Sequence, residues 1–185
     1  MTESAAGRLL VAGPGLLDPN FYRAVVLILE HGEDGAVGVT LNRPLDVQAA
    51  EHVPAWHKLL AAPMVVYSGG PVQREIAVGV ARRPIPEGLD PEWHPVLGEV
   101  GLVDLTVEPE ELGGVTAARV FSGYAGWGPD QLEWELSEPT SWFVVDAEIA
   151  DVFSDEPAGL WRQVLARQEG HLSWFADYPL DPATN

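Results

Sequence analysis

Arg119-Val-Phe-Ser-Gly-Tyr-Ala-Gly-Trp-Gly-Pro-Asp-Gln-Leu-Glu-Trp-Glu-Leu136 is the stretch that decides the fold. Its first residues include β-branched and aromatic side chains, which favour a strand. Over 122–128, three glycines alternate with aromatic residues and predict a tight elbow. Pro129 suits the first position of a helix, so we expect residues 129–136 to be helical. The stretch therefore predicts a strand, an elbow and a helix in succession.

A β-hairpin is predicted upstream of this stretch. Residues 24–29 form a continuous apolar run whose length favours a strand buried on both faces. Asp34-Gly35 is a strong signal for a hairpin turn, and residues 36–41 form the returning strand. Hairpins early in the chain and a mixture of strands and helices later favour an α+β fold over a doubly wound parallel sheet.

The chain has 185 residues, enough for one domain with a substantial core. No repeat, low-complexity run or linker divides it. We expect a disordered N-terminus at 1–6, a single domain at 7–175 and a polar C-terminal tail at 176–185.

Composition excludes several classes of protein. The chain has no cysteine, so it has no disulfide framework and no thiol chemistry. It lacks an apolar run of membrane-spanning length and the basic and apolar regions of a signal peptide, so we expect a cytoplasmic protein without a membrane association. The formal net charge is −18, and a nucleic acid is itself a polyanion. Direct binding to nucleic acid is therefore disfavoured.

The sequence patterns of common catalytic sites are missing. There is no phosphate-binding loop, no dinucleotide fingerprint and no nucleophile elbow. The two nearest histidines, His52 and His57, are five residues apart and do not share a helical face. We therefore assign no catalytic residue, no metal site and no cofactor, and the sequence favours a non-catalytic protein.

Asn42-Arg43-Pro44 is the first of three distinctive loops, and it ends a buried strand. The Arg43 guanidinium could pair with a carboxylate or phosphate of a ligand. Alternatively, it neutralises one of the many internal acids.

Two glycine-rich segments complete this set. Ser68-Gly69-Gly70-Pro71 can expose backbone N–H groups to an anion, or it can be a tight turn where two backbones pack closely. In the elbow, Tyr124 and Trp127 are either ligand contacts or core aromatics with polar tips bonded to the backbone. Gln131 follows them at the start of the predicted helix.

Four stretches in this order resemble the YqgE/AlgH family of small bacterial proteins. They are Leu16–Val26, Glu30–Pro44, Gly69–Val72 and Gly123–Leu136, and the resemblance covers roughly 8–175. It implies a single α+β domain whose mixed or antiparallel sheet partly closes into a small barrel flanked by helices. The family is largely uncharacterised. One branch is associated with alginate production and is often labelled a transcriptional regulator, a role that this acidic chain would exert indirectly.

Our leading hypothesis is a binding or indirect regulatory module whose three loops meet in one cleft. Its partner would be an unidentified protein or small molecule. One alternative is an enzyme, or a nucleotide or phosphometabolite binder, with Arg43 as the anion anchor. A purely structural role for the loops is the third. The candidate binding residues are Asn42, Arg43, Gly69, Gly70, Tyr124, Trp127 and Gln131.

Overall fold

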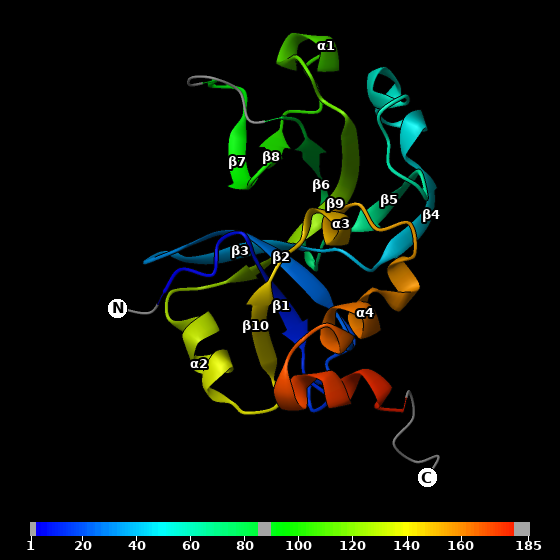
Figure 1. The fold of residues 1–185 in the computed structure, drawn as a ribbon. Helices are drawn as coiled ribbons and strands as arrows, with labels where there is room; N and C mark the ends of the chain where they lie inside the picture. Colours follow the sequence, from blue (N-terminus) through cyan, green and yellow to red (C-terminus); the bar gives the residue numbers. More distant parts are fainter. Residues whose placement is uncertain (1–2, 85–89, 180–185) are drawn as a thin grey trace.

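The protein is described by a computed structural model over residues 3–84 and 90–179. In that part of the chain, ten strands form one connected sheet that curls into a half-barrel (Figure 1). The strands are β1 Arg8–Ala12, β2 Val25–Gly32, β3 Gly35–Thr40, β4 Pro44–Gln48, β5 Val65–Ser68, β6 Val72–Arg82, β7 His94–Leu97, β8 Val100–Val103, β9 Ala117–Trp127 and β10 Trp142–Asp146. The predicted α+β fold is confirmed, and so is the predicted hairpin, which is formed by β2 and β3.

Strand β9 organises the sheet. The main path runs β10-β1-β2-β3-β9-β6-β8-β7, with β5 inserted beside β9 and β4 beside β5. The strand pairs are antiparallel except for β5 and β9, which run parallel with Tyr67 opposite Phe121. β9 therefore makes hydrogen-bonded ladders with β3, β5 and β6.

The predicted elbow over 122–128 is wrong. β9 continues through it to Trp127, because Ala125–Trp127 pairs with Ala36–Gly38 of β3. Gly123 has a φ of 70°, which bends the strand without ending the pairing. The predicted helix exists, but it begins at Gln131 rather than Pro129.

Helices cover the sheet on both sides. Alternate residues of β1 point to opposite faces, so Leu9 and Val11 enter one core cluster and Leu10 enters another. The first cluster receives α3 and α4, and the second receives α2. A third cluster lies where η1 and η2 pack with β6, β8 and β9. The helices are α1 Pro109–Leu112, α2 Gln131–Ser137, α3 Ile149–Val152 and α4 Leu160–Ala166, with 3-10 turns η1 Ala49–Glu51, η2 Pro54–Trp56, η3 Pro157–Gly159 and η4 Gly170–Asp177.

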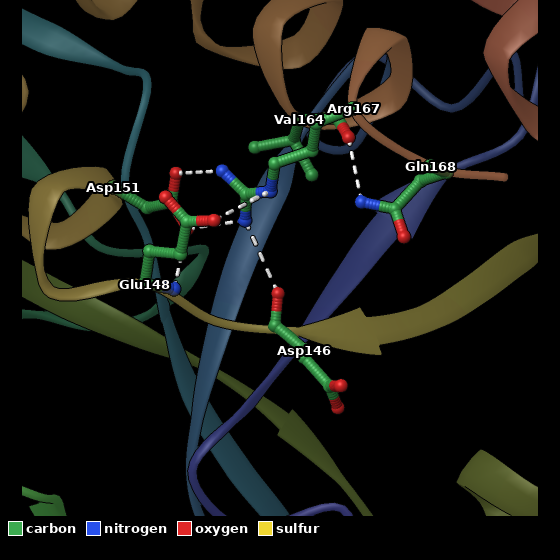
Figure 2. Close-up of polar contacts among 6 residues, drawn as sticks. All are labelled: Asp146, Glu148, Asp151, Val164, Arg167 and Gln168. Atoms are coloured by element: carbon green, nitrogen blue, oxygen red, sulfur yellow. Dashed lines mark hydrogen bonds and ion pairs between the residues drawn. The ribbon is translucent and has the colours of Figure 1, made fainter.

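An ion pair fastens α3 to the end of α4 (Figure 2). Both guanidinium Nη atoms of Arg167 donate to the Asp151 carboxylate at 2.6 Å. Asp151 also accepts the backbone N–H of Glu148 at 2.7 Å, and Glu148 lies 3.5 Å from Arg167. Arg167 also donates to the backbone carbonyl of Asp146. Asp151 and Glu148 are therefore both paired with Arg167 and stabilise the contact between α3 and α4.

The chain ends are only partly described. The expected disordered N-terminus includes residues 1–2, which lie outside the described part. Within residues 3–6, Ala5 is buried and donates its backbone N–H to His31 Nδ1 at 2.9 Å. In the expected tail, residues 180–185 lie outside the described part.

Candidate functional site

The Asn42 side chain holds the backbone at the start of β2. The residue is 9% exposed. Its Oδ1 accepts the backbone N–H of Val25, and its Nδ2 donates to the carbonyl of Arg23. The amide therefore spans the start of β2 and has both of its groups occupied. Its contribution to the site is to hold the chain at Arg43 in place.

Arg43 is half-buried and bonds to backbone carbonyls. Its guanidinium donates to the carbonyl oxygens of Tyr22 and Asn42. Among residues 3–84 and 90–179, no carboxylate lies within ion-pair distance of it. Burial lowers the pKa of Arg43, but a guanidinium remains charged in a protein. Arg43 therefore does not neutralise an internal acid of the described chain.

Two other arginines, in contrast, do form ion pairs with carboxylates of the chain. Arg83 donates to Asp90 at 2.8 Å, and Arg167 makes its paired bonds to Asp151. Both have a carboxylate at hydrogen-bond distance, which Arg43 lacks in the described part of the chain. The charge of Arg43 is consequently available to an anion from outside.

Gly69 and Gly70 allow the chain to pass directly against β9. Gly69 donates its N–H to Ser122 and accepts the N–H of Thr40, both at 2.9 Å. A Cβ added to Gly69 would lie 2.1 Å from the carbonyl oxygen of Gly123, and one on Gly70 would lie 2.2 Å from the carbonyl carbon of Tyr124. The pair is thus a tight crossing of two backbones.

A hollow lies between this crossing and Arg43, and we call it the arginine pocket. Its volume is about 130 Å³. It is lined by Pro19, Asn20, Thr40, Arg43, Ser68, Gly70, Pro71 and Arg74. Two of these residues are arginines and none is acidic. In the described part of the chain, the exposed Arg74 guanidinium also has no carboxylate partner.

Thr40, in the wall of the arginine pocket, carries a buried polar group without a partner in the described chain. The residue is 1% exposed, and its hydroxyl oxygen has no hydrogen-bond partner in the described part of the molecule. Buried hydroxyls normally have a partner, because leaving one unpaired costs about 1–3 kcal/mol. The oxygen is shielded from bulk water, and other atoms of the pocket wall lie around it because Thr40 belongs to the lining.

A larger hollow of about 650 Å³ adjoins the arginine pocket and shares Pro19 and Arg43 with it. Arg23 and Arg162 also line it. Four of the ten basic side chains in a chain of net charge −18 are therefore concentrated at two neighbouring hollows. Such an arrangement attracts anions locally despite the overall negative charge.

The aromatic candidates lie along β9 and α2. Tyr124 donates its hydroxyl to Gln73 at 3.2 Å. Trp127 is 5% exposed and packs in the second core cluster, where its ring stacks on Phe21. Neither Trp127 nor Gln131 belongs to the lining of the two arginine-rich hollows. The structure thus brings Arg43 and Gly70 together and places Trp127 and Gln131 elsewhere.

Trp127 and Gln131 both donate hydrogen bonds to Glu135 of α2. Its Oε2 accepts the indole N–H groups of Trp127 and Trp142 at 2.9 Å, and its Oε1 accepts the Gln131 amide at 2.9 Å. Because Trp142 is also buried, one carboxylate satisfies two buried indoles. These contacts fix α2 against the sheet.

We expect Glu135→Ala to lower the free energy of unfolding by about 2 kcal/mol, because two buried N–H groups lose their acceptor. Urea denaturation followed by tryptophan fluorescence measures this. Glu138→Ala, which removes an exposed glutamate near the same helix, is the control and should change stability by less than about 0.5 kcal/mol. Equal effects for the two variants would contradict the role of Glu135.

Sequence reasoning missed most of the arginine pocket, since only Arg43 and Gly70 of its lining residues were among the candidates. Arg74, Thr40, Ser68 and Asn20 were not among the candidates, although Ser68 stood beside the glycine pair. The pocket joins three segments that are far apart in the chain. The one available signal was the scarcity of basic residues, 10 against 28 acidic ones, which makes each arginine near a candidate loop informative.

Residues 3–84 and 90–179 contain neither a metal-binding cluster nor a membrane-spanning helix. No three His, Asp or Glu side chains gather closely enough there to hold a metal ion. No helix there has the length and apolar character needed to cross a membrane.

Comparisons with known proteins agree on one family. The model of the family described as AlgH-like matches residues 9–173. A UPF0301 protein of Streptomyces coelicolor is 51% identical over 193 residues, covering 100% of this chain and 98% of the relative. A UPF0301 protein of Mycobacterium tuberculosis is 42% identical over 185 residues, covering 97% of this chain and 90% of the relative.

Two solved structures have the same fold. A crystal structure of a Corynebacterium diphtheriae protein superimposes with a TM-score of 0.87 at 32% identity, covering 96% of this chain and 94% of that one. The solution structure of AlgH from Pseudomonas aeruginosa gives a TM-score of 0.67 at 28% identity, covering 97% of this chain and 98% of that one.

Proposed function

The chain belongs to the AlgH-like family, and from this premise we propose that it is a non-catalytic module that binds a small anionic ligand in the arginine pocket. The names of its relatives state no reaction or ligand, so the argument depends on the site itself. The ligand would carry a phosphate or carboxylate group.

The observation that carries this proposal is the pair of uncompensated arginines at one hollow. Arg43 is held in place by carbonyls, and Arg74 lines the same pocket without a carboxylate partner in the described chain. In a protein this acidic, leaving both charges unpaired costs electrostatic stabilisation that a bound anion would restore. The Thr40 hydroxyl adds a polar group without a partner in the described chain.

Catalysis is the weaker alternative because the pocket offers no proton acceptor. No histidine, aspartate or glutamate lines it. His52, Glu75 and Ser122 do line a neighbouring groove, but the Ser122 hydroxyl donates to the carbonyl of Arg74. Among the described residues, no hydrogen bond connects these three side chains, so they do not form an activated nucleophile.

We further propose that the module works in the cytoplasm and that any regulatory role is indirect. A net charge of −18 opposes contact with a nucleic acid, so a change in transcription would require a protein partner or a ligand signal.

The test is binding of inorganic phosphate and pyrophosphate, measured by isothermal titration calorimetry at low ionic strength. We expect saturable binding to the wild type. Arg74→Gln, whose guanidinium has no partner in the described chain, should weaken it about 10- to 100-fold, the loss of one charged hydrogen-bonding partner. Arg43→Gln should have at least this effect. Arg82→Gln is the matched control, because Arg82 pairs at the surface with Glu99, and it should leave the affinity unchanged.

If phosphate and pyrophosphate bind no better than chloride, the proposal fails. It also fails if Arg74→Gln and Arg82→Gln weaken binding equally, since this would indicate a general charge effect.

A further inference from the structure

An apolar groove lies beside the arginine pocket. Its volume is about 400 Å³, within the range of small-molecule sites. Leu45 and Val47 of β4, Val66 of β5, Ile76 of β6 and Val120 of β9 line it. Leu45, Val47 and Ile76 remain 37–42% exposed, which is a large apolar exposure for neighbouring strands of one sheet.

The groove and the arginine pocket lie along the same face of β5. Side chains two residues apart on a strand point to the same face, so Val66 in the groove and Ser68 in the pocket are neighbours on that face. Tyr67, between them, points to the opposite side and packs in the first core cluster. Ser68 is also paired with Ser122, which lines the groove.

Arg74 lines both hollows and therefore marks the point where they meet. A ligand that extends from one into the other would find basic side chains at one end and mainly apolar side chains along the groove, whose lining also includes His52, Glu75 and Ser122. This polarity matches a molecule with an anionic head and an apolar tail.

We propose that the ligand of this protein is a free single-chain anionic amphiphile, with its phosphate or carboxylate head in the arginine pocket and its alkyl chain in the groove. The proposal rests on the anion site described above and names the chemical class of its ligand. The groove's apolar wall would be covered by the chain, which explains why aliphatic residues are tolerated at an exposed position.

Charge favours a free chain over a membrane or a second copy. A protein of net charge −18 is repelled by an anionic bilayer and by itself, whereas a single amphiphile carries little charge and delivers it directly to two arginines.

Calorimetric titration with ethyl, butyl, hexyl and octyl phosphate, each below its micelle-forming concentration, tests the proposal. Affinity should become about two- to fourfold tighter for each methylene that enters the groove. It should level off when the groove is full. Octyl glucoside, which has the same chain and a neutral head, should bind far more weakly than octyl phosphate.

Variants separate the tail from the head. Ile76→Gln and Leu45→Gln should remove most of the gain between ethyl and octyl phosphate while leaving the affinity for inorganic phosphate unchanged. Trp134→Gln is the matched control, because Trp134 is an exposed apolar residue on α2 and is absent from the groove lining. Its affinities should equal those of the wild type.

The outcomes distinguish the two proposals. If phosphate binds but chain length adds nothing, the amphiphile is wrong and the anion site stands. If neither phosphate nor any alkyl phosphate binds, both are wrong. If the protein co-sediments with phosphatidylglycerol vesicles and Ile76→Gln abolishes this, the groove binds a bilayer and not a free amphiphile. If analytical ultracentrifugation shows a dimer and Ile76→Gln dissociates it, the groove binds a second copy of the chain and the amphiphile is wrong.

Discussion

Gly70→Ala will lower the free energy of unfolding by about 3 kcal/mol or more, the effect of forcing volume into packed structure. A Cβ at position 70 would lie 2.2 Å from the carbonyl carbon of Tyr124 and 2.3 Å from the backbone nitrogen of Ala125. These atoms belong to β9, which is paired with β3 directly after this point. The clash therefore cannot be relieved by turning a side chain, and the central strand itself must move.

Urea denaturation followed by circular dichroism measures this loss. Gly32→Ala is the matched control, because Gly32 also lies in the sheet and a Cβ there meets no atom of the described structure within 4 Å. Its stability should stay within about 0.5 kcal/mol of the wild type. A Gly70→Ala protein as stable as Gly32→Ala would show that the two backbones do not cross at this distance.

Asp151→Ala should lower the free energy of unfolding by about 3 kcal/mol, the lower end of the range for breaking a buried ion pair. The Asp151 side chain is 4% exposed and the Arg167 side chain 26%, so the pair is largely removed from water. The hydrogen bonds to Asp151 are the main reason why the pKa of Arg167 is raised. The substitution also removes the carboxylate that caps α3 at Glu148.

Differential scanning calorimetry of Asp151→Ala beside Glu99→Ala tests this prediction. Glu99 pairs with Arg82 at a similar distance of 2.8 Å, but both side chains are more than a third exposed. Solvent screening limits such a pair to about 0–1 kcal/mol. Similar shifts in Tm for the two variants would mean that burial does not strengthen the Asp151–Arg167 pair.

Local signals in the sequence predicted local structure well. The hairpin of β2 and β3 was found because an apolar β-branched run, Asp34-Gly35 and a second apolar run all favour it. The elbow was predicted wrongly because glycines near aromatics are typical of turns. In the protein, the strand continues because β3 is there to pair with it, and that partner lies about ninety residues earlier in the chain.

The candidate site was predictable only in part for the same reason. Arg43 could be identified from its place after a buried strand, and Gly70 from the glycine pair. Arg74 and Thr40 could not, because nothing in the local pattern shows which residues of β3 and β6 will face Arg43. The sequence predicts Trp127 and Gln131 as candidate contacts because they lie in the elbow and at the start of the helix, but both donate hydrogen bonds to Glu135.

The position of β9 in the chain also has a consequence for biosynthesis. β3, β5 and β6 leave the ribosome before their common partner, since β9 begins only at residue 117. Until then, each of the three has an edge without its native neighbour, and open edges invite pairing with other chains. The nascent protein therefore passes through an aggregation-prone interval that ends when Ala117–Trp127 has left the ribosome and paired with these strands. Many acidic residues along the chain would keep such nascent chains apart during that interval by mutual repulsion.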